Sequence, residues 1–305
     1  MPKKIKLTVV GSVNMDLVVR SPRRPEIGES IIGGGFFISP GGKGANQAVA
    51  CARMGAETFF VGRVGSDVFG DSLRESLKKS GVSIEHLKTS GAATGVALIT
   101  VVNGDNYIVT DAGANATLLP DSVAEYEDLL LESDAVLLQF EIPLATNKKI
   151  IDICKNKTPV FLNPAPAVKI DPRLLDGIDY FTPNETEAPF YTGIKINNID
   201  DAISSLDALR RAGVKRPVIT LGEKGAVYFD GEKNVHREAY RVTAVDTTAA
   251  GDTFAGAFAC MAASGEPIGC AVDFAAAAAA LSVTRGGAQG SIPAYAEVAE
   301  MIARR

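Results

Sequence analysis

The sequence predicts an α/β protein built on a doubly wound, mostly parallel sheet, a Rossmann-type three-layer sandwich. Short β-rich runs alternate along the chain with segments of helical spacing about ten residues long. Glycines stand where several of these segments end. Two further β-rich stretches lack an intervening helix, and they predict a small β lid in addition to the main sheet.

The alternation begins with a β-rich run at 6–10, which ends at Gly11 as a buried strand would. Helical spacing follows at 46–54 and stops at Gly55, a usual residue just after a helix. The remaining strands are expected at 57–64, 135–139, 159–163, 179–183 and 217–221. The remaining helices are expected at 68–80, 146–155, 200–212 and 254–263. Strands separated by such helices pair in parallel.

The two stretches without a helix are 15–39 and 95–111, and both contain several glycines. We expect them to pair as a small antiparallel flap over a ligand site. Ligands of doubly wound sheets bind beyond the carboxyl ends of the strands. The lid and the site are therefore predicted at the same edge of the sheet.

Composition excludes several classes of function. A net charge of −5 leaves no excess of Lys and Arg to neutralise phosphates of nucleic acid. The apolar run at 7–10 is too short for a signal peptide, and the alanine-rich segment 274–283 is too short to cross a bilayer. The four cysteines are Cys51, Cys154, Cys260 and Cys270. Because they lack CxxC spacing, we expect buried thiols and a cytoplasmic protein that binds neither nucleic acid nor membrane.

The segment VDTTAAGDTF at 245–254 leads into a predicted helix. Residues 249–252 would form its first turn, where free N–H groups and the positive end of the helix dipole attract anions. A carboxylate at Asp252 does not help anion binding, but it suits a reaction in which a hydroxyl is deprotonated as it attacks phosphorus. Asp252 is equally well interpreted as an acid that favours a first turn, and this segment alone leaves both open.

Two N-terminal segments carry polar groups suited to a sugar. GGKGAN at 41–46 enters a helix without the spacing of a P-loop, and its Lys43 and Asn46 offer donors. GSVNMD at 11–16 places Asn14 and Asp16 on the same side of an extended chain. Amide and carboxylate pairs hold sugar hydroxyls. The alternatives are a plain turn for the first segment and capping for the second.

Seven segments together resemble the PfkB carbohydrate kinase family, which includes ribokinase, fructokinase and adenosine kinase. They are GSVNMD at 11–16, GGKGANQA at 41–48, AGAN at 112–115, TPNETE at 182–187, TLGEKGA at 220–226, DTTAAGDTF at 246–254 and TRGGAQGSIP at 284–293. The resemblance covers essentially the whole chain. It implies a single kinase domain over 1–305 that includes the lid.

The resemblance implies ATP-dependent phosphorylation of a sugar, with Asp252 as general base and the backbone of Ala250 and Gly251 as anion hole. The sugar would be held by Asn14, Asp16, Gly42, Lys43, Gly44, Asn46, Glu141 and Asp252. For Glu141, which follows a predicted strand, the alternative is an acid at a helix start. The triphosphate and its Mg²⁺ would be held by Asn184 and Glu187. The nucleotide loop would comprise Thr220, Gly222 and Gly225, for which a simple turn between strands is the alternative.

A monovalent cation, K⁺, is also implied beside the anion hole. Its ligands would be Asp246 and Thr248, the backbone oxygens of Ser282, Arg285 and Gly287, and Ser291. The lid of this family commonly makes a dimer contact, which implies a homodimer.

The GGKGANQA segment resembles the version in family members that act on D-ribose. This implies phosphorylation of the ribose 5-hydroxyl, with ribose 5-phosphate and ADP as products. One alternative is a kinase for deoxyribose or another sugar. A second is a non-catalytic sensor of sugar or nucleotide, which is disfavoured because the anion-hole turn, Lys43 and Asp252 are all present.

Overall fold

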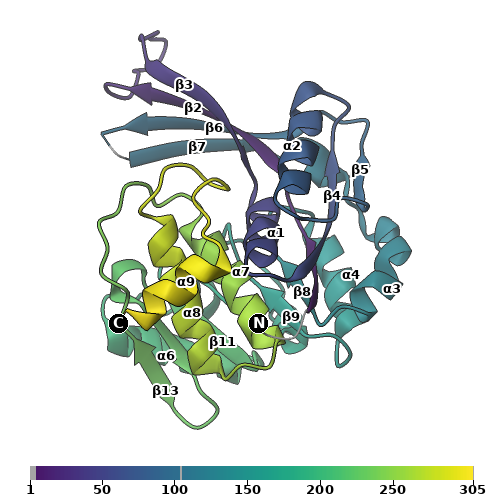
Figure 1. Ribbon diagram of the computed structural model, residues 1–305, viewed down its shortest axis with the longest axis vertical. Helices are drawn as coiled ribbons and strands as arrows, with labels where there is room; N and C mark the ends of the chain where they lie inside the picture. Colours follow the sequence, from purple (N-terminus) through teal and green to yellow (C-terminus); the bar gives the residue numbers. More distant parts are fainter. Residues whose placement is uncertain (1–4, 104, 305) are drawn as a thin grey trace.

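A computed structural model describes residues 5–103 and 105–304. Its main sheet has the strand order β13-β12-β11-β10-β9-β8-β1-β4-β5 (Figure 1). These strands are β1 Lys6–Val10, β4 Glu57–Val64, β5 Leu87–Thr89, β8 Ala135–Leu138, β9 Val160–Leu162, β10 Tyr180–Phe181, β11 Arg216–Thr220, β12 Ala226–Phe229 and β13 Asn234–Arg237. The strands from β11 to β5 pair in parallel, and β12 and β13 extend the sheet in antiparallel fashion.

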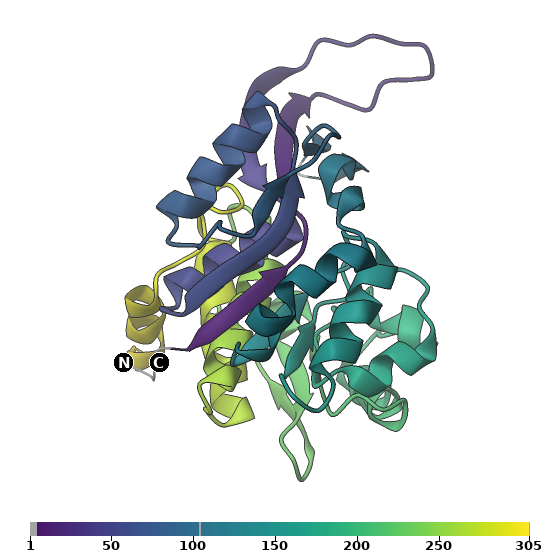
Figure 2. The ribbon, with the colours of Figure 1, turned by 90° about the vertical axis from the view of Figure 1, so that its right-hand side faces the viewer.

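Helices cover both faces of this sheet, as Figure 2 shows. The helices are α1 Lys43–Arg53, α2 Val68–Lys79, α3 Glu127–Leu131, α4 Leu144–Cys154, α5 Ala188–Thr192, α6 Ile199–Arg211, α7 Ala250–Ala263, α8 Ile268–Ser282 and α9 Tyr295–Ala303. Successive buried residues of β8 contribute to two separate hydrophobic cores. Leu137 packs in the core that includes α1, α7 and α8, whereas Val136 and Leu138 pack in the core that includes α4 and α6. Burial on both faces explains why the parallel strands are continuously apolar.

The predicted fold class is confirmed, and every strand and helix expected for the main sheet is present within a few residues. Helix α1 begins at Lys43, three residues before the expected start, because Gly42 precedes it with a φ of 90°. The hairpin of β12 and β13 and helix α8 were not predicted. Helix α8 is rich in alanine and apolar on most sides, so it lacks the helical period that marks a half-buried helix.

The lid is a second sheet in the order β3-β2-β6-β7, with β2 Asn14–Ser21, β3 Gly34–Gly41, β6 Gly95–Val102 and β7 Asp105–Asp111. The prediction that the lid is antiparallel is wrong for its central pair, since β2 and β6 are parallel. The pairing register begins at Asn14 and Gly95, so both strands start at the same edge of the lid and run in the same direction. Figure 1 shows the lid at the top, above α1.

The strand order reverses direction between β1 and β8, since the chain proceeds from β1 toward β5 on one side and from β8 toward β11 on the other. Doubly wound sheets bind ligands at such a switch point, beyond the carboxyl ends of the strands. Here the segments after β1 and β8 begin at Gly11 and Gln139. Both lie at the base of the lid, which is where the site is expected.

Two expectations from composition are tested by the structure. Cys51, Cys154 and Cys260 are buried free thiols as predicted, but Cys270 is exposed, so burial was predicted wrongly for it. Cys270 lies in the first turn of α8, on the side that faces away from the core. In the part of the chain that the structure describes, no helix is both long enough and apolar enough to cross a membrane.

Candidate active site

Asp252 lies in the first turn of α7 and is buried. The turn begins at Ala249, which has a left-handed φ of 61°. Both carboxylate oxygens of Asp252 accept hydrogen bonds from α1. Asn46 Nδ2 donates to Oδ2 at 2.9 Å, and Gln47 Nε2 donates to Oδ1 at 3.2 Å. The acid is therefore more than a residue that favours a helix start, because α1 holds its side chain in one orientation.

The pKa of Asp252 is raised, mainly by burial and to a smaller extent by Glu141. The charge of Lys43 and the hydrogen bonds from Asn46 and Gln47 lower the pKa and offset part of this shift. A carboxylate with a raised pKa is a stronger base than one in water. The environment of Asp252 thus suits proton abstraction from a hydroxyl group.

Asn14 and Asp16, at the start of β2, reach the same cluster. Asn14 Oδ1 accepts a hydrogen bond of 2.7 Å from Asn115 Nδ2, which leaves the Asn14 amide nitrogen as the group available to a sugar. Asp16 packs against Gly41, where any side chain would overlap its carboxylate. Burial, Glu141 and Asp252 together raise the pKa of Asp16 to about 7.

Glu141 follows β8 and faces the start of α1. Its Oε2 accepts hydrogen bonds from Ser12 Oγ at 2.5 Å and from the Lys43 backbone N–H at 3.1 Å. The structure thus gives Glu141 the role at a helix start that was its alternative interpretation. The residue still lies within the cluster, because its charge raises the pKa of Asp16, Asp252 and Lys43.

Lys43 lies in the field of four carboxylates. Burial lowers its pKa, but the charges of Asp252, Glu141, Glu187 and Asp16 raise it by more. Four carboxylates around the single positive charge of Lys43 give the cluster a net negative charge. Such a cluster suits neutral sugar hydroxyls, and it requires added cations before it can accept a polyphosphate.

Gly42 and Gly44, which were predicted to help hold the sugar, also have a packing role that was not predicted. A Cβ at Gly42 would lie 2.7 Å from the Asn14 backbone nitrogen, and one at Gly44 would lie 2.7 Å from that of Ser12. These glycines therefore allow the start of α1 to pack against the segment after β1. Their contribution to the site is to bring Lys43 and Asn46 next to Asn14.

Asn184 and Glu187 form a reciprocal cap before α5. Asn184 Oδ1 accepts from the Glu187 N–H at 2.8 Å, and Glu187 Oε2 accepts from the Asn184 N–H at 2.9 Å. This local role was not predicted. It occupies one of the two Glu187 carboxylate oxygens and the single side-chain oxygen of Asn184, which also accepts from the Thr186 N–H and from Thr186 Oγ1, each at 2.8 Å. Asn184 also forms a β-bridge with Thr220, so the two predicted nucleotide segments lie side by side.

Gly222 and Gly225 flank a short turn between β11 and β12, which is the alternative interpretation of this loop. Both have positive φ, and a Cβ at Gly225 would overlap the Arg237 carbonyl oxygen, whereas one at Gly222 would meet open space.

In the predicted anion hole, a Cβ at Gly251 would also meet open space, while the Ala250 N–H donates to the Thr247 carbonyl at 3.2 Å. Gly251 is therefore the more accessible of the two residues.

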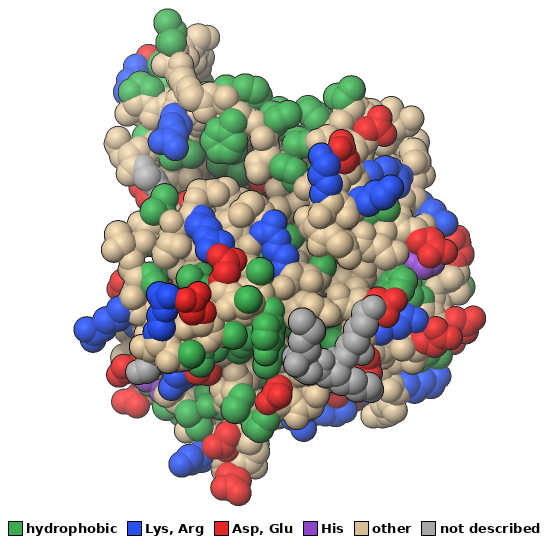
Figure 3. Space-filling model, viewed as in Figure 1, with side chains coloured by type: hydrophobic (Ala, Val, Ile, Leu, Met, Phe, Trp, Pro, Cys, Tyr) green, Lys and Arg blue, Asp and Glu red, His purple; other side chains and the backbone are tan. Residues whose placement is uncertain are grey.

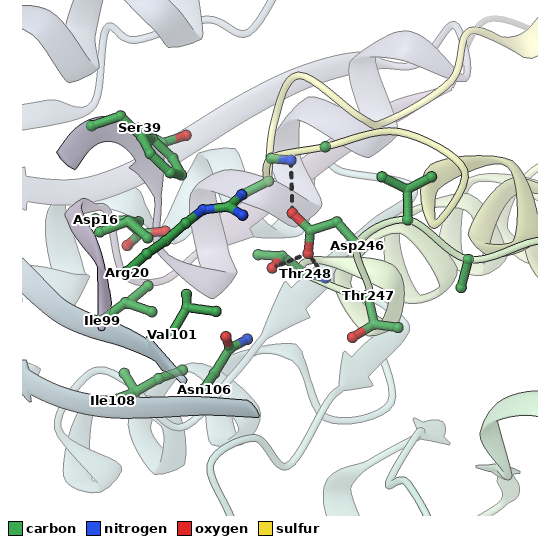
Figure 4. A pocket seen from close by; sticks show the side chains of 17 residues that line it. Asp16, Arg20, Ser39, Ile99, Val101, Asn106, Ile108, Asp246, Thr247 and Thr248 are labelled. Carbon is green, nitrogen blue, oxygen red and sulfur yellow. Dashed lines mark hydrogen bonds between the residues drawn. The ribbon is translucent and has the colours of Figure 1, made fainter. Parts of the chain in front are cut away.

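Asp246 joins two loops near the start of α7. Its Oδ1 accepts from the Thr248 N–H at 2.9 Å and from Thr248 Oγ1 at 2.6 Å, and its Oδ2 accepts from the Gly287 N–H at 2.9 Å (Figure 4). Partial burial raises the pKa of Asp246, but these hydrogen bonds outweigh burial and lower it. Figure 4 also shows Arg20 of the lid pointing across the pocket toward Asp246.

This pocket has a volume of about 430 Å³ and extends from Asp16 under the lid to Asp246 and Thr248. The other predicted cation ligands contribute differently. The Ser282 carbonyl accepts from the Arg285 N–H at 3.1 Å, and Ser291 Oγ donates to the Ala288 carbonyl at 2.8 Å. The Arg285 side chain pairs with Glu297, so it turns toward α9.

Sequence reasoning missed several residues that position the site, although three lie in the quoted motifs. Gln47 contacts Asp252, Ser12 contacts Glu141, and Asn115 contacts Asn14. Two more, Gln139 and Asn163, contact Gln47. Two signals in the sequence could have identified these residues: Gln139 and Asn163 are polar residues directly after a buried strand, and the other three lie within the motifs.

Nearly the whole chain, including this site, matches one known family. A model described as pfkB family carbohydrate kinase matches residues 4–295. The chain belongs to this family. The chain is therefore a kinase of the ribokinase fold, as its resemblance predicted, and the alternative of a non-catalytic sensor is not retained.

Three members of the pfkB family illustrate the similarity. A ribokinase of Bacillus subtilis is 41% identical over 298 residues, which cover 97% of this chain and 99% of that protein. A deoxyribokinase of Salmonella typhimurium is 35% identical over 300 residues, with coverage of 97% and 98%. The structure of Arabidopsis thaliana ribokinase complexed with ribose and ATP has a TM-score of 0.91 and 34% identity, with coverage of 98% and 99%.

Asp16 should destabilise the folded state at neutral and higher pH. A carboxyl group whose folded pKa is about 7 favours folding less and less as pH rises from its unfolded value of 3.8 toward 7. One pKa unit corresponds to about 1.4 kcal/mol. At pH 8 we therefore expect the free energy of unfolding of Asp16→Asn to be about 1–3 kcal/mol higher than that of wild type. The gain should be smaller at pH 5, as measured by urea titration. Asp105→Asn on the exposed edge of the lid is the control, and an equal gain at both pH values would contradict this role of Asp16.

Proposed function

We propose that this pfkB-family kinase phosphorylates the 5-hydroxyl of D-ribose with ATP, giving D-ribose 5-phosphate and ADP. The observation that carries the proposal is the buried Asp252 carboxylate, held by α1 beside the open turn at Gly251. Sugar-binding side chains surround it, namely Asn14, Asp16, Lys43, Asn46 and Glu141. The identity of the sugar rests on the ribokinases that match nearly the full chain at about 40% identity.

In the proposed reaction, Asn14, Asp16 and Asn46 hold the ribose hydroxyls under the lid. The amide nitrogen of Asn14 donates, and the Asp16 carboxylate accepts. Asn46 Oδ1 is buried and has no hydrogen-bond partner within the described residues, so it is a ready acceptor for a hydroxyl group. The sugar is thereby bound by donors and acceptors that the protein itself leaves unused.

Asp252 then accepts the proton of the 5-hydroxyl as its oxygen attacks the γ-phosphorus of ATP. A new O–P bond forms, the bond between the γ-phosphorus and the bridging oxygen breaks, and ADP leaves with that bond's electron pair. In the α7 turn, the N–H of Gly251 and the N–H of Ala250, which also donates to the Thr247 carbonyl, stabilise the charge on the transferring group together with the helix dipole. Lys43 supplies further positive charge.

Cations are required by the charge of the site. The four carboxylates near Lys43 would repel a triphosphate, and Mg²⁺ carried by that triphosphate would neutralise part of its charge. Within the described residues, no three His, Cys, Asp or Glu side chains cluster as a metal site. We propose that Asn184 and Glu187 would hold the Mg²⁺ of ATP through water.

A second cation, K⁺, is proposed beside the α7 turn, where Asp246 fixes the loops of Thr248 and Gly287. The carboxylate charge and nearby carbonyl groups form the oxygen-rich environment that a hard monovalent cation prefers. Ser282, Arg285 and Ser291 complete the proposed set through the adjoining loop. When bound, K⁺ would stabilise the conformation of the residues before Asp252.

The outer face of the lid is the proposed dimer surface. Leu17, Ile38, Leu98 and Val109 are cross-strand neighbours on that face. The last three are 50%, 54% and 69% exposed, which is unusual for apolar side chains that lie next to one another. Figure 3 shows hydrophobic side chains gathered around the lid.

Reliance on ATP and the free cysteines support the cytoplasm as the proposed location.

A panel of pentoses and hexoses tests the choice of sugar. We expect D-ribose to give the highest kcat/KM in an ADP-release assay, with ribose 5-phosphate identified by ³¹P NMR. Deoxyribose should be poorer, because it lacks the 2-hydroxyl and would leave a buried polar group of the site unpaired. Faster turnover of deoxyribose or fructose would overturn ribose as the substrate, while leaving the family unchanged.

Replacement of Na⁺ by K⁺ at fixed ionic strength tests the cation site. We expect kcat to rise in K⁺, because the cation would stabilise the turn that binds the transferring phosphoryl group. Asp246→Ala should flatten this response, whereas Asp230→Ala in the distant turn between β12 and β13 should preserve it. Equal rates of the wild-type enzyme in the two salts would remove K⁺ from the proposed mechanism.

A further inference from the structure

A chain of buried amide side chains lies behind Asp252. Gln47 Nε2 donates to Asp252 Oδ1 at 3.2 Å and to Asn163 Oδ1 at 3.1 Å. Gln139 Nε2 donates to Gln47 Oε1 at 2.6 Å. Gln47 belongs to α1, while Gln139 and Asn163 directly follow β8 and β9. The Gln47 side chain is therefore contacted from three other parts of the chain: the start of α7, the segment after β8 and the segment after β9.

The hydrogen-bond directions in this chain leave the Gln47 amide one orientation. Asn163 Nδ2 donates to the Thr182 carbonyl at 2.8 Å, so Asn163 presents its oxygen to Gln47. Gln139 donates to the Gln47 oxygen, so the Gln47 nitrogen must face Asp252 and Asn163. A reversed amide would place its oxygen against the Asp252 carboxylate and lose all three hydrogen bonds.

Gln139 is itself held firmly. Asn147 Nδ2 donates to its backbone carbonyl at 2.7 Å, and its side-chain oxygen fills the space beside Gly11, where any Cβ would overlap it. This oxygen is buried and has no hydrogen-bond partner within the described residues. An unsatisfied buried acceptor lowers stability. Within the described residues, the one hydrogen bond of the Gln139 side chain is the bond to Gln47.

We propose that Gln47 is a positioning residue for phosphoryl transfer, with Gln139 and Asn163 fixing its amide so that it holds Asp252 Oδ1. The proposal rests on the function proposed above. Asn46 holds the other oxygen, Oδ2, and its own Oδ1 is free to accept from the sugar. The carboxylate plane is thereby fixed from two sides before substrate binds. A base that is held in the reactive geometry does not lose rate to reorientation.

Gln47 also affects the charge state of Asp252. The charged groups that act on Asp252 are Lys43 of α1 and Glu141 after β8, and those on which Asp252 acts in turn include Asp16 of the lid and Glu187 before α5. Against these carboxylates, the Gln47 N–H group favours the ionised form of Asp252. Its removal should raise the pKa of Asp252, so activity should be lost at a higher pH as the solution is acidified.

Gln47→Met tests the proposal, because it keeps the length and helix propensity of glutamine but removes the amide. We expect kcat to fall by about 10- to 100-fold, the range for a modest misplacement of a reacting group, with the KM for ribose changed by less than about threefold. The acid limb of kcat should move to higher pH. Thr146→Val is the matched control. It removes a buried hydrogen bond of 2.6 Å to the Leu118 carbonyl and should lower stability without changing kcat or its pH profile.

The decisive comparison repeats Gln47→Met in an Asp252→Asn background. If Gln47 acts through Asp252, the second substitution should change the residual kcat by less than about twofold, because coupled residues are not additive. An equal loss of rate in both backgrounds, or a wild-type kcat for Gln47→Met, would overturn the proposal. Should Gln47→Met fail to fold, Gln139→Met carries the same comparison, with a smaller loss expected. A wild-type rate for Asp252→Asn alone would instead refute Asp252 as the base, whereas failure of the wild-type protein to phosphorylate ribose would refute the proposed function.

Discussion

The hydrogen bonds between α1 and the buried carboxylate of Asp252 are the contacts on which the rest of the site depends. A carboxylate can remain charged away from water only if nearby groups replace its solvation. Asn46 and Gln47 do so from consecutive positions of α1. Helices α1 and α7 must therefore pack very closely. Gly256 permits this approach, because a Cβ there would lie 2.5 Å from the Ala50 Cβ.

Close packing at this point also concentrates charge. The start of α1 brings Lys43 to the carboxyl end of β1, and the segments after β1 and β8 bring Asp16 and Glu141 to the same place. Burial, and to a smaller extent the neighbouring carboxylates, raise the pKa of Asp16, so this cluster of acids is unfavourable for the free protein. The same cluster allows a neutral sugar to be bound by several acceptors and makes the proposed reaction depend on cations. The same carboxylates therefore lower the stability of the free protein and serve the proposed reaction.

Much of this arrangement could be predicted from the sequence. Apolar runs alternating with helical spacing were sufficient for the parallel sheet, because strands buried on both faces have that pattern. Asp252, Asn46 and Asp16 were identified because they lie in turns just after strands or at helix starts. The parallel pairing of β2 with β6 depends on two distant segments that start at the same edge, which no local pattern records. The roles of Gln139 and Asn163 depend likewise on contacts between side chains far apart in the sequence.

Replacement of Asp252 by Asn tests the central claim most directly. Asparagine keeps the size of the side chain but cannot accept the proton, and a positioned base contributes about 10²–10⁴-fold to such a rate. The account predicts that kcat falls by at least about 100-fold, equivalent to about 3 kcal/mol of transition-state stabilisation, while the KM for ATP changes only a few-fold. The melting temperature should be close to that of wild type, which would show that the loss is chemical. A variant that retains more than about a tenth of wild-type kcat would mean that Asp252 is not the base, and it would contradict the mechanism.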